Sequence, residues 1–170
     1  MVKYVSLGIA CGVAEQFKYK NVRGASLPLD WMVNEKFWSV LAIFKDHFKD
    51  FGNPEHWSVF FNQEGMVDNM VKYFHTKYMG LISVHDFSEE CDIEDVCKKL
   101  TRRADRMMNM IRSGEDRLVF VRDEQGHDLE ERYGEGCYEA ALKEFHSIIR
   151  SMNPNLDWEL VVLADTKNEV

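Results

Sequence analysis

Three short apolar runs constrain the fold of this chain more than any other feature. They lie at residues 4–7, 118–121 and 160–163, and segments with helical spacing of apolar side chains separate them. Continuous runs of this length are typical of strands buried on both faces of a parallel sheet, with helices as crossovers. The pattern predicts an α/β fold, organised as a three-layer sandwich with a mostly parallel central sheet and helices on both faces.

Apolar periodicity also predicts the helices. A shorter pair of aromatic and β-branched runs, at 57–61 and 81–84, predicts two further strands. Residues 66–79 fit either a helix or a strand near 71–74, and the spacing leaves both open. The predicted helices cover residues 35–49, 93–113 and 138–149.

The size of the chain suits a single core. Of its 170 residues, 45% are hydrophobic, so we expect one α/β domain over residues 1–164, followed by a polar tail at 165–170. No apolar run reaches the ~18 residues of a membrane span, and the start of the chain lacks the apolar core of a signal peptide. We therefore expect an intracellular, cytoplasmic protein without a membrane partner.

Cysteine spacing and net charge exclude several classes of protein. The cysteines lack the close pairs of a zinc site and are too sparse for a disulfide framework, so we expect reduced thiols, no metal and no cofactor. The net charge of −8 opposes binding to nucleic acid. Its acidic residues gather at 89–95, where a helix begins, and at 123–131, which we interpret as a solvated loop. The four cysteines are Cys11, Cys91, Cys97 and Cys137.

Cys11 stands where the first strand passes through Gly8 into a helix. At a helix start, unpaired backbone N–H groups and the helix dipole favour the thiolate, which is a nucleophile. A small cysteine that merely fills the gap between strand and helix is the structural alternative.

Other reactive side chains follow other predicted strands. His85 and Asp86 come after one strand, Arg122 after another and Asp165 after the last. Because the carboxyl ends of parallel strands share one edge of a sheet, these groups and Cys11 are the parts of a thiol hydrolase. Whether Cys11 and His85 meet depends on the strand order, and His85 can equally be an ordinary polar residue at a strand end.

Several short motifs resemble a known family. They are SLGIACGVA at residues 6–14, ASLPLDW at 25–31, HDF at 85–87, an arginine pair at 102–103 and a strand that ends in Arg122. In this order they are similar to the papain-like cysteine peptidases grouped as a domain of unknown function. The resemblance implies that Cys11 is the nucleophile and His85 the base. It does not supply the substrate, for which we expect a peptide or a small acyl compound. Leu29 stands where the family has phenylalanine, a change that keeps an apolar contact.

Asp30 is the first candidate for a third catalytic residue. Pro28 restricts the chain before it and Trp31 anchors the chain after it, so its carboxylate is held in place and could orient His85. Alternatively, Asp30 caps a nearby turn or helix, which is the commoner role of aspartate before a helix. Asp86 and Asp165 are the other candidates.

The remaining candidates would bind substrate. Arg103 borders the apolar face of its predicted helix, and with Arg122 it could bind a substrate carboxylate or phosphate, or neutralise the nearby aspartates. Gly12 would offer its N–H group to an oxyanion, and Trp31 would form an apolar wall.

Two other functions remain open. Gly8 and Gly12 follow a strand and open a helix, as in a Rossmann-like nucleotide-binding module, although the third glycine and the later acidic residue of that motif are missing. A non-catalytic interaction protein on the same scaffold is the other alternative.

Overall fold

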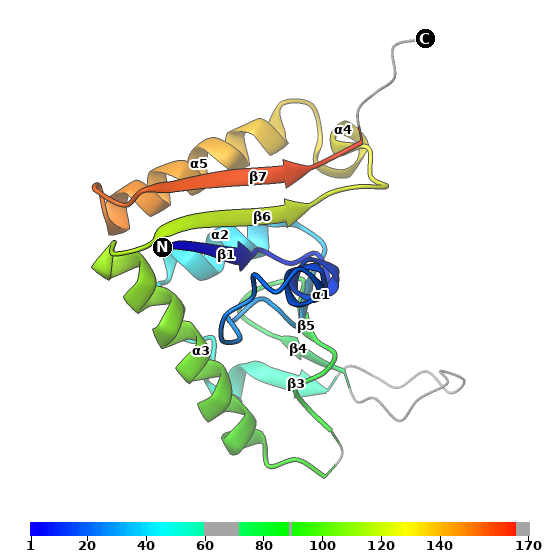
Figure 1. Ribbon diagram of the computed structural model, residues 1–170. Helices are drawn as coiled ribbons and strands as arrows, with labels where there is room; N and C mark the ends of the chain where they lie inside the picture. The colour runs from blue at the N-terminus through cyan, green and yellow to red at the C-terminus, as the bar shows by residue number, and fades with distance from the viewer. Residues whose placement is uncertain (60–71, 89, 166–170) are drawn as a thin grey trace.

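A parallel sheet of three strands forms one half of the molecule (Figure 1). The computed structural model describes residues 1–59, 72–88 and 90–165. The strand order is β1-β6-β7 and both pairings are parallel. These strands overlap the three apolar runs of the sequence, so the prediction of parallel strands is confirmed. The bounds are Val2–Ser6 for β1, Arg117–Asp123 for β6 and Trp158–Leu163 for β7.

A second sheet, which the sequence did not predict as separate, is antiparallel throughout. Its order is β2-β5-β4-β3. Only five residues separate β4 from β5, far fewer than the dozen or more that a parallel crossover needs. The fold is therefore mixed α/β, and a single, mostly parallel central sheet is not what the structure shows. The bounds are Met32–Asn34 for β2, Trp57–Val59 for β3, Tyr73–His75 for β4 and Leu81–Ser83 for β5.

β3 and β5 lie within the two predicted shorter strands. β4 shows that the described end of the ambiguous stretch 66–79 is a strand, whereas residues 66–71 fall outside the described residues.

Alternate side chains of β6 face two different layers of helices. Val119 and Val121 pack with Val13 of α1 (Gly12–Tyr19) on one face. Phe120 points to the other face, where its ring centroid lies 5.4 Å from that of Phe145 in α5 (Cys137–Met152). Helix α2 (Phe37–Lys45) packs beside α5 on that second face.

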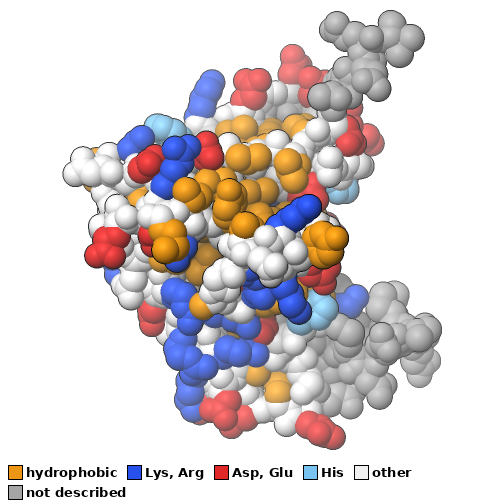
Figure 2. Space-filling view, viewed as in Figure 1, with side chains coloured by type: hydrophobic (Ala, Val, Ile, Leu, Met, Phe, Trp, Pro, Cys, Tyr) orange, Lys and Arg blue, Asp and Glu red, His pale blue; other side chains and the backbone are white. Residues whose placement is uncertain are grey.

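The face of the parallel sheet that carries α1 is only partly covered. Figure 2 shows hydrophobic side chains gathered over the upper half of this face, beside α1. Tyr4, Val161 and Leu163 are among the exposed large apolar residues, with 37%, 36% and 39% of their surface accessible. The predicted three-layer sandwich is therefore not confirmed, because α1 is too short to form a full layer.

The predicted helices are present, with differences at their ends. α2 ends at Lys45, short of the predicted residue 49, because His47 and Phe48 have positive φ angles of 52° and 59°. α3 (Ile93–Ser113) begins as predicted, with Asp92 accepting a hydrogen bond from the Glu94 N–H group at 2.8 Å.

The short 3₁₀ helix η1 (Pro54–His56) and α4 (Leu129–Tyr133) complete the fold. α4 occupies part of the segment that was interpreted as a loop, and the Asp128 carboxylate caps it. Within the described ranges, no helix combines the length and apolar character needed to cross a bilayer.

Candidate functional site

A strained loop connects β1 to Cys11. Gly8 and Ile9 have φ angles of 78° and 68°, and a β-branched residue such as isoleucine rarely adopts this left-handed conformation. Asn34 at the end of β2 holds the loop in place. Its backbone N–H group donates to the Ile9 carbonyl oxygen at 3.1 Å, and its Oδ1 accepts from the Ile9 N–H group at 3.4 Å.

Gly8 is required in this loop for two reasons. Its positive φ disfavours any other residue, and a Cβ atom would lie 2.2 Å from Nδ2 of Asn34.

Cys11 is the N-terminal cap residue of α1, as the sequence predicted. Its side chain is half-buried and makes no capping hydrogen bond. The backbone N–H groups that follow Cys11 lie in the first turn of the helix, so they have no hydrogen-bond partners within the helix. No atom lies within 4 Å of the position that a Cβ atom of Gly12 would occupy, among the described residues. A ligand can therefore approach the start of α1 beside Cys11.

The electrostatic environment of Cys11 differs from the prediction. Burial raises the pKa of the Cys11 thiol, and the Glu15 carboxylate one turn along α1 raises it further, while a backbone N–H group lowers it. Burial and the Glu15 charge together outweigh the stabilisation of the thiolate that the sequence predicted at the start of a helix. The isolated protein therefore favours the protonated thiol.

His85 lies two residues beyond β5 and is exposed. Its ring forms a T-shaped pair with the ring of Trp31, with ring centroids 6.0 Å apart and an interplanar angle of 81°. The guanidinium of Arg23 covers the face of Trp31 at 4.7 Å from the ring centroid. Trp31 thus links His85 to a charged side chain on the segment 21–31.

Asp30 is buried, with 3% of its surface accessible. Its carboxylate accepts hydrogen bonds from Arg23 Nη2 at 3.1 Å and from the Leu27 N–H group at 2.9 Å. Burial raises the pKa of Asp30, and these two donors oppose that increase. The bond to Leu27 is the turn-capping role that the sequence left open, and the described residues show no hydrogen bond from Asp30 to His85. Its predicted role as the third catalytic residue stays a prediction.

Cys11 and His85 lie on loops that follow strands of different sheets. The shared parallel edge expected from the sequence is therefore wrong for this pair, because β5 belongs to the antiparallel sheet. β2 connects the two loops: Met32 pairs with Ser83 at the end of β5, and Asn34 bonds to Ile9 before Cys11. No hydrogen bond joins the Cys11 thiol to His85 in the described part of the chain.

Asp86 and Arg103 form a largely buried ion pair. Arg103 Nη1 donates to both carboxylate oxygens of Asp86 at 3.0 Å, and Lys99 Nζ lies 2.8 Å from the same carboxylate. Arg103 therefore has the neutralising role that was one of its two predictions. Arg106, one turn further along α3, donates to the Ser26 carbonyl oxygen. α3 thus holds both motif-bearing segments, 25–31 and 85–87.

Arg122 is completely buried. It donates to Glu124 Oε1 at 2.8 Å, to the Leu7 carbonyl oxygen at 3.1 Å and to the Asn34 carbonyl oxygen at 3.1 Å. In this conformation it binds the backbone next to the strained loop and joins the two sheets. It does not reach a surface where substrate could bind. The neutralising role considered for Arg122 is also present, although its partner is Glu124 and not Asp30 or Asp86.

Sequence reasoning missed Glu124 and Asn34 as parts of this site. Glu124 looked like one acid of a solvated loop. Its spacing of two residues from Arg122 was the available signal, because such residues share one side of an extended chain. Asn34 carried no local signal, since its role depends on where β2 lies.

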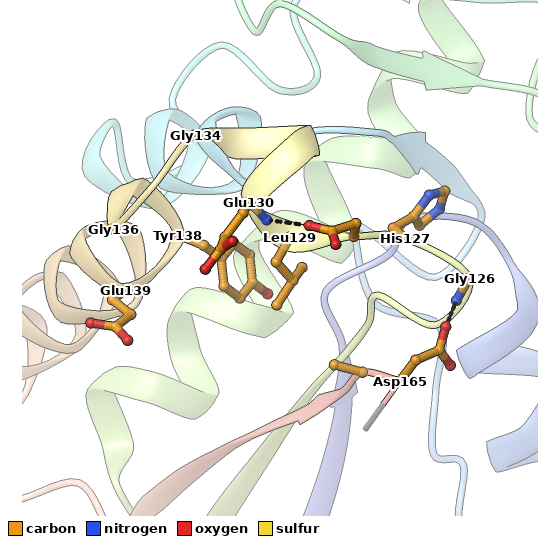
Figure 3. A pocket seen from close by; sticks show the side chains of 11 residues that line it. Gly126, His127, Leu129, Glu130, Gly134, Gly136, Tyr138, Glu139 and Asp165 are labelled. Atoms are coloured by element: carbon orange, nitrogen blue, oxygen red, sulfur yellow. Dashed lines mark hydrogen bonds between the residues drawn. The ribbon is translucent and has the colours of Figure 1, made fainter. Parts of the chain in front are cut away.

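Two cavities lie near the carboxyl ends of the parallel strands. One of about 410 Å³ is lined by Ile9 and Ala10, directly before Cys11, and by Lys36, His127 and Arg132 among others. The other, of about 460 Å³, lies between α4, α5 and Asp165 (Figure 3). Neither is lined by Cys11 or His85. The described residues contain no cluster of three or more metal-binding side chains.

The fold and this site define a mixed α/β protein that presents a cysteine at a helix start from a strained loop. Residues 2–168 match the family described as "Putative papain-like cysteine peptidase", and the chain belongs to that family. It is also 30% identical over 137 residues to an uncharacterized protein of Acanthamoeba polyphaga mimivirus. The match covers 71% of this chain and 61% of the viral protein. No solved structure matches the chain.

Proposed function

We propose that this protein is a papain-like cysteine hydrolase in which Cys11 attacks the carbonyl group of a peptide or small acyl substrate. The observation that carries this proposal is the strained loop at Gly8 and Ile9. Backbone strain of this kind persists only where the surroundings impose it, and it concentrates at functional sites. Here two hydrogen bonds to Asn34 impose it directly before the cysteine.

The reaction needs a proton acceptor for the thiol, and His85 takes this role in the proposal. His85 accepts the proton of Cys11, the sulfur bonds to the carbonyl carbon, and the N–H groups of Cys11 and Gly12 bind the developing oxyanion. His85 then protonates the leaving group, and a water molecule hydrolyses the thioester. Because the free thiol has a raised pKa, His85 must approach Cys11 when substrate binds. Catalytic hydrogen bonds often tighten only in the substrate complex.

Trp31 and Arg23 supply the positioning of His85 in this proposal. The ring of Trp31 limits the tilt of the imidazole, and Arg23 fixes Trp31 by covering its face. Asp30 affects the position of His85 indirectly, because its carboxylate forms an ion pair with Arg23. Replacing Asp30 by Asn should therefore weaken the placement of His85 without removing its direct partner.

Acylation by p-nitrophenyl acetate tests the proposal. We expect a burst of p-nitrophenol equal to one acyl group per protein, an acetyl group on Cys11 by mass spectrometry, and no burst from Cys11→Ser. His85→Ala should slow acylation by about a hundredfold or more, whereas the matched control His127→Ala should not. If wild-type protein gives no Cys11-dependent acylation, or if His85→Ala acylates at the wild-type rate, the proposal is wrong.

A non-catalytic interaction protein is the second candidate, favoured by the raised pKa of Cys11 and by the lack of a hydrogen bond between Cys11 and His85 in the residues that the structure describes. Iodoacetamide labelling distinguishes the two functions. A hydrolase should label at Cys11 faster than at the exposed Cys137 in the same sample, with a rate that depends on His85. Labelling of Cys11 at or below the Cys137 rate across pH 6–9, without acylation, favours the interaction protein.

A further inference from the structure

One side of α3 carries a row of cations, here called the cationic face. It consists of Lys99, Arg102, Arg103 and Arg106, at the three- and four-residue spacing that places side chains on one side of a helix. Asp105, the one acidic residue within this stretch, is rotated by about 100° from Arg106 around the helix. Figure 2 shows Lys and Arg side chains gathered over the middle of α3 and from there toward α1.

The cationic face reaches the candidate site. Arg103 donates to both carboxylate oxygens of Asp86, the residue that follows His85. Another cation, Arg23, covers the ring of Trp31, which forms the T-shaped pair with His85. A ligand bound to the cationic face would therefore lie beside the histidine of the proposed hydrolase.

More positive than negative charge lies on the cationic face. Lys99 and Arg103 share a single carboxylate, that of Asp86. Arg102 and Arg106 form no ion pair among the described residues, and Arg106 donates to a neutral carbonyl oxygen instead. The chain as a whole has a net charge of −8, so this local excess of positive charge runs against its composition. Such an excess attracts an anionic ligand.

The length of the row limits the size of this ligand. Lys99 and Arg106 are separated by about 10 Å along the helix axis, at a rise of about 1.5 Å per residue. This distance corresponds to about three residues of extended polypeptide. Before the row, α3 begins with the acidic residues Asp92, Glu94 and Asp95. They would repel a long polyanion such as nucleic acid where it extended past the row, so the cationic face fits a short acidic segment better.

We propose that the cationic face binds a polypeptide segment with about three consecutive acidic residues. The guanidinium groups of Arg102 and Arg106 donate to its carboxylates, a pairing that their planar geometry favours, and the charges of Lys99 and Arg103 add attraction. In the hydrolase this segment belongs to the substrate, a step that rests on the proposed function. The substrate is then a polypeptide cleaved beside a run of aspartate or glutamate.

Fluorescence polarisation with labelled peptides tests the binding, and Cys11→Ser as the parent protein prevents turnover. A peptide with three consecutive glutamates should bind, and raising NaCl from 50 to 500 mM should weaken its binding about tenfold. Adding Arg102→Glu should weaken it about five- to tenfold. Arg112→Glu is the matched control, because it changes the net charge equally at an exposed arginine of the same helix. Arg112 is rotated by about 120° from Arg106, so this variant should bind like the parent.

Further probes decide the class of ligand. A peptide with three glutamines in place of the glutamates should not bind, and free glutamate should not compete at the concentration at which the acidic peptide saturates. Equal binding of the two peptides would overturn the proposal, as would an equal loss of affinity in Arg102→Glu and Arg112→Glu. Tighter binding of a single-stranded DNA oligonucleotide than of the acidic peptide would assign the cationic face to nucleic acid and overturn it as well.

The p-nitrophenyl esters of the same two peptides test the substrate role in the protein with Cys11 intact. The acidic ester should acylate Cys11 about fivefold faster than the glutamine ester at 50 mM NaCl, because binding energy raises kcat/KM. Equal rates would overturn the assignment of the acidic segment to the substrate. If no ester acylates Cys11, the hydrolase proposal fails, whereas peptide binding by Cys11→Ser is measured without it, so the two failures are distinguishable.

Discussion

His75 in β4 offers a quantitative test of how burial and hydrogen bonding act in this fold. It is 1% exposed and lies between the rings of Trp57 and Tyr78, at centroid distances of 4.8 and 4.4 Å. Its Nδ1 accepts hydrogen bonds from the Lys77 and Tyr78 N–H groups at 3.2 and 3.1 Å, and its Nε2 lies 3.0 Å from the Asp50 carbonyl oxygen. The native ring is therefore neutral, with its proton on Nε2.

The magnitude follows from the change in pKa. Burial lowers the pKa of His75 from 6.5 to about 4, and a difference of about 2.5 corresponds to ~3 kcal/mol. Above pH 6.5 the ring is neutral in both states, so the whole contribution is present. Between pH 6.5 and 4 the unfolded chain binds a proton that the native state does not, so stability falls as the pH falls. Below pH 4 this residue causes no further loss.

Urea unfolding of wild type and His75→Gln at pH 7.5, 6.5, 5.5 and 4.5 measures this contribution. Wild type should lose up to ~3 kcal/mol more than the variant across this range, because the carboxylates common to both proteins cancel in the difference. If the variant does not fold, an NMR titration of the imidazole signals in wild type gives the pKa directly, with the exposed His127 as control. An imidazole pKa of His75 above 6, or equal losses in both proteins, would refute the reasoning.

Three further predictions concern the cysteine loop. Arg122→Met should lower the free energy of unfolding by about 3 to 5 kcal/mol, because it removes the cation that donates to the buried Glu124 carboxylate at 2.8 Å and leaves Arg132, at 3.9 Å, as the remaining cation beside it; a urea midpoint like that of wild type would contradict this. Gly8→Ala should cost at least ~2 kcal/mol through its positive φ and the clash in the loop, whereas Gly12→Ala, with open space around it, should be nearly neutral; equal costs would argue against strain. Glu15→Gln should speed alkylation of Cys11 at pH 7.5 about twofold by removing a nearby negative charge, and an unchanged rate would show that burial alone sets the thiol pKa.

The parallel half of the fold could be predicted because its strands are long, apolar and separated by periodic helices. The antiparallel sheet could not, because each of its four described strands has only three residues, and pairing between such short strands is a tertiary property. The positive φ angles of His47 and Phe48 could not be predicted either, because histidine adopts this conformation only occasionally and phenylalanine rarely does.

In the site, the sequence located what depends on nearby residues. Cys11 at the start of a helix and Arg103 at the border of an apolar face both follow from local spacing. The hydrogen-bond and ion-pair partners of these side chains do not follow from local spacing, because they depend on how distant segments pack. Asp30 bonds to Arg23 and Leu27, Asp86 to α3, and the predicted thiolate is opposed by burial that only the folded chain creates.

The hydrogen bonds between Asn34 and Ile9 place the cysteine loop at the contact between the two sheets. Asn34 ends a strand of the antiparallel sheet, whereas Ile9 continues a strand of the parallel sheet, so the loop spans the seam between two independently hydrogen-bonded units. A shift of one sheet relative to the other would therefore disturb this contact, together with the Arg122 hydrogen bonds that also join the sheets. The reactivity of the Cys11 thiol therefore depends on how the two sheets are placed relative to each other. Substitutions far from the thiol that weaken the contact between the sheets should change this reactivity.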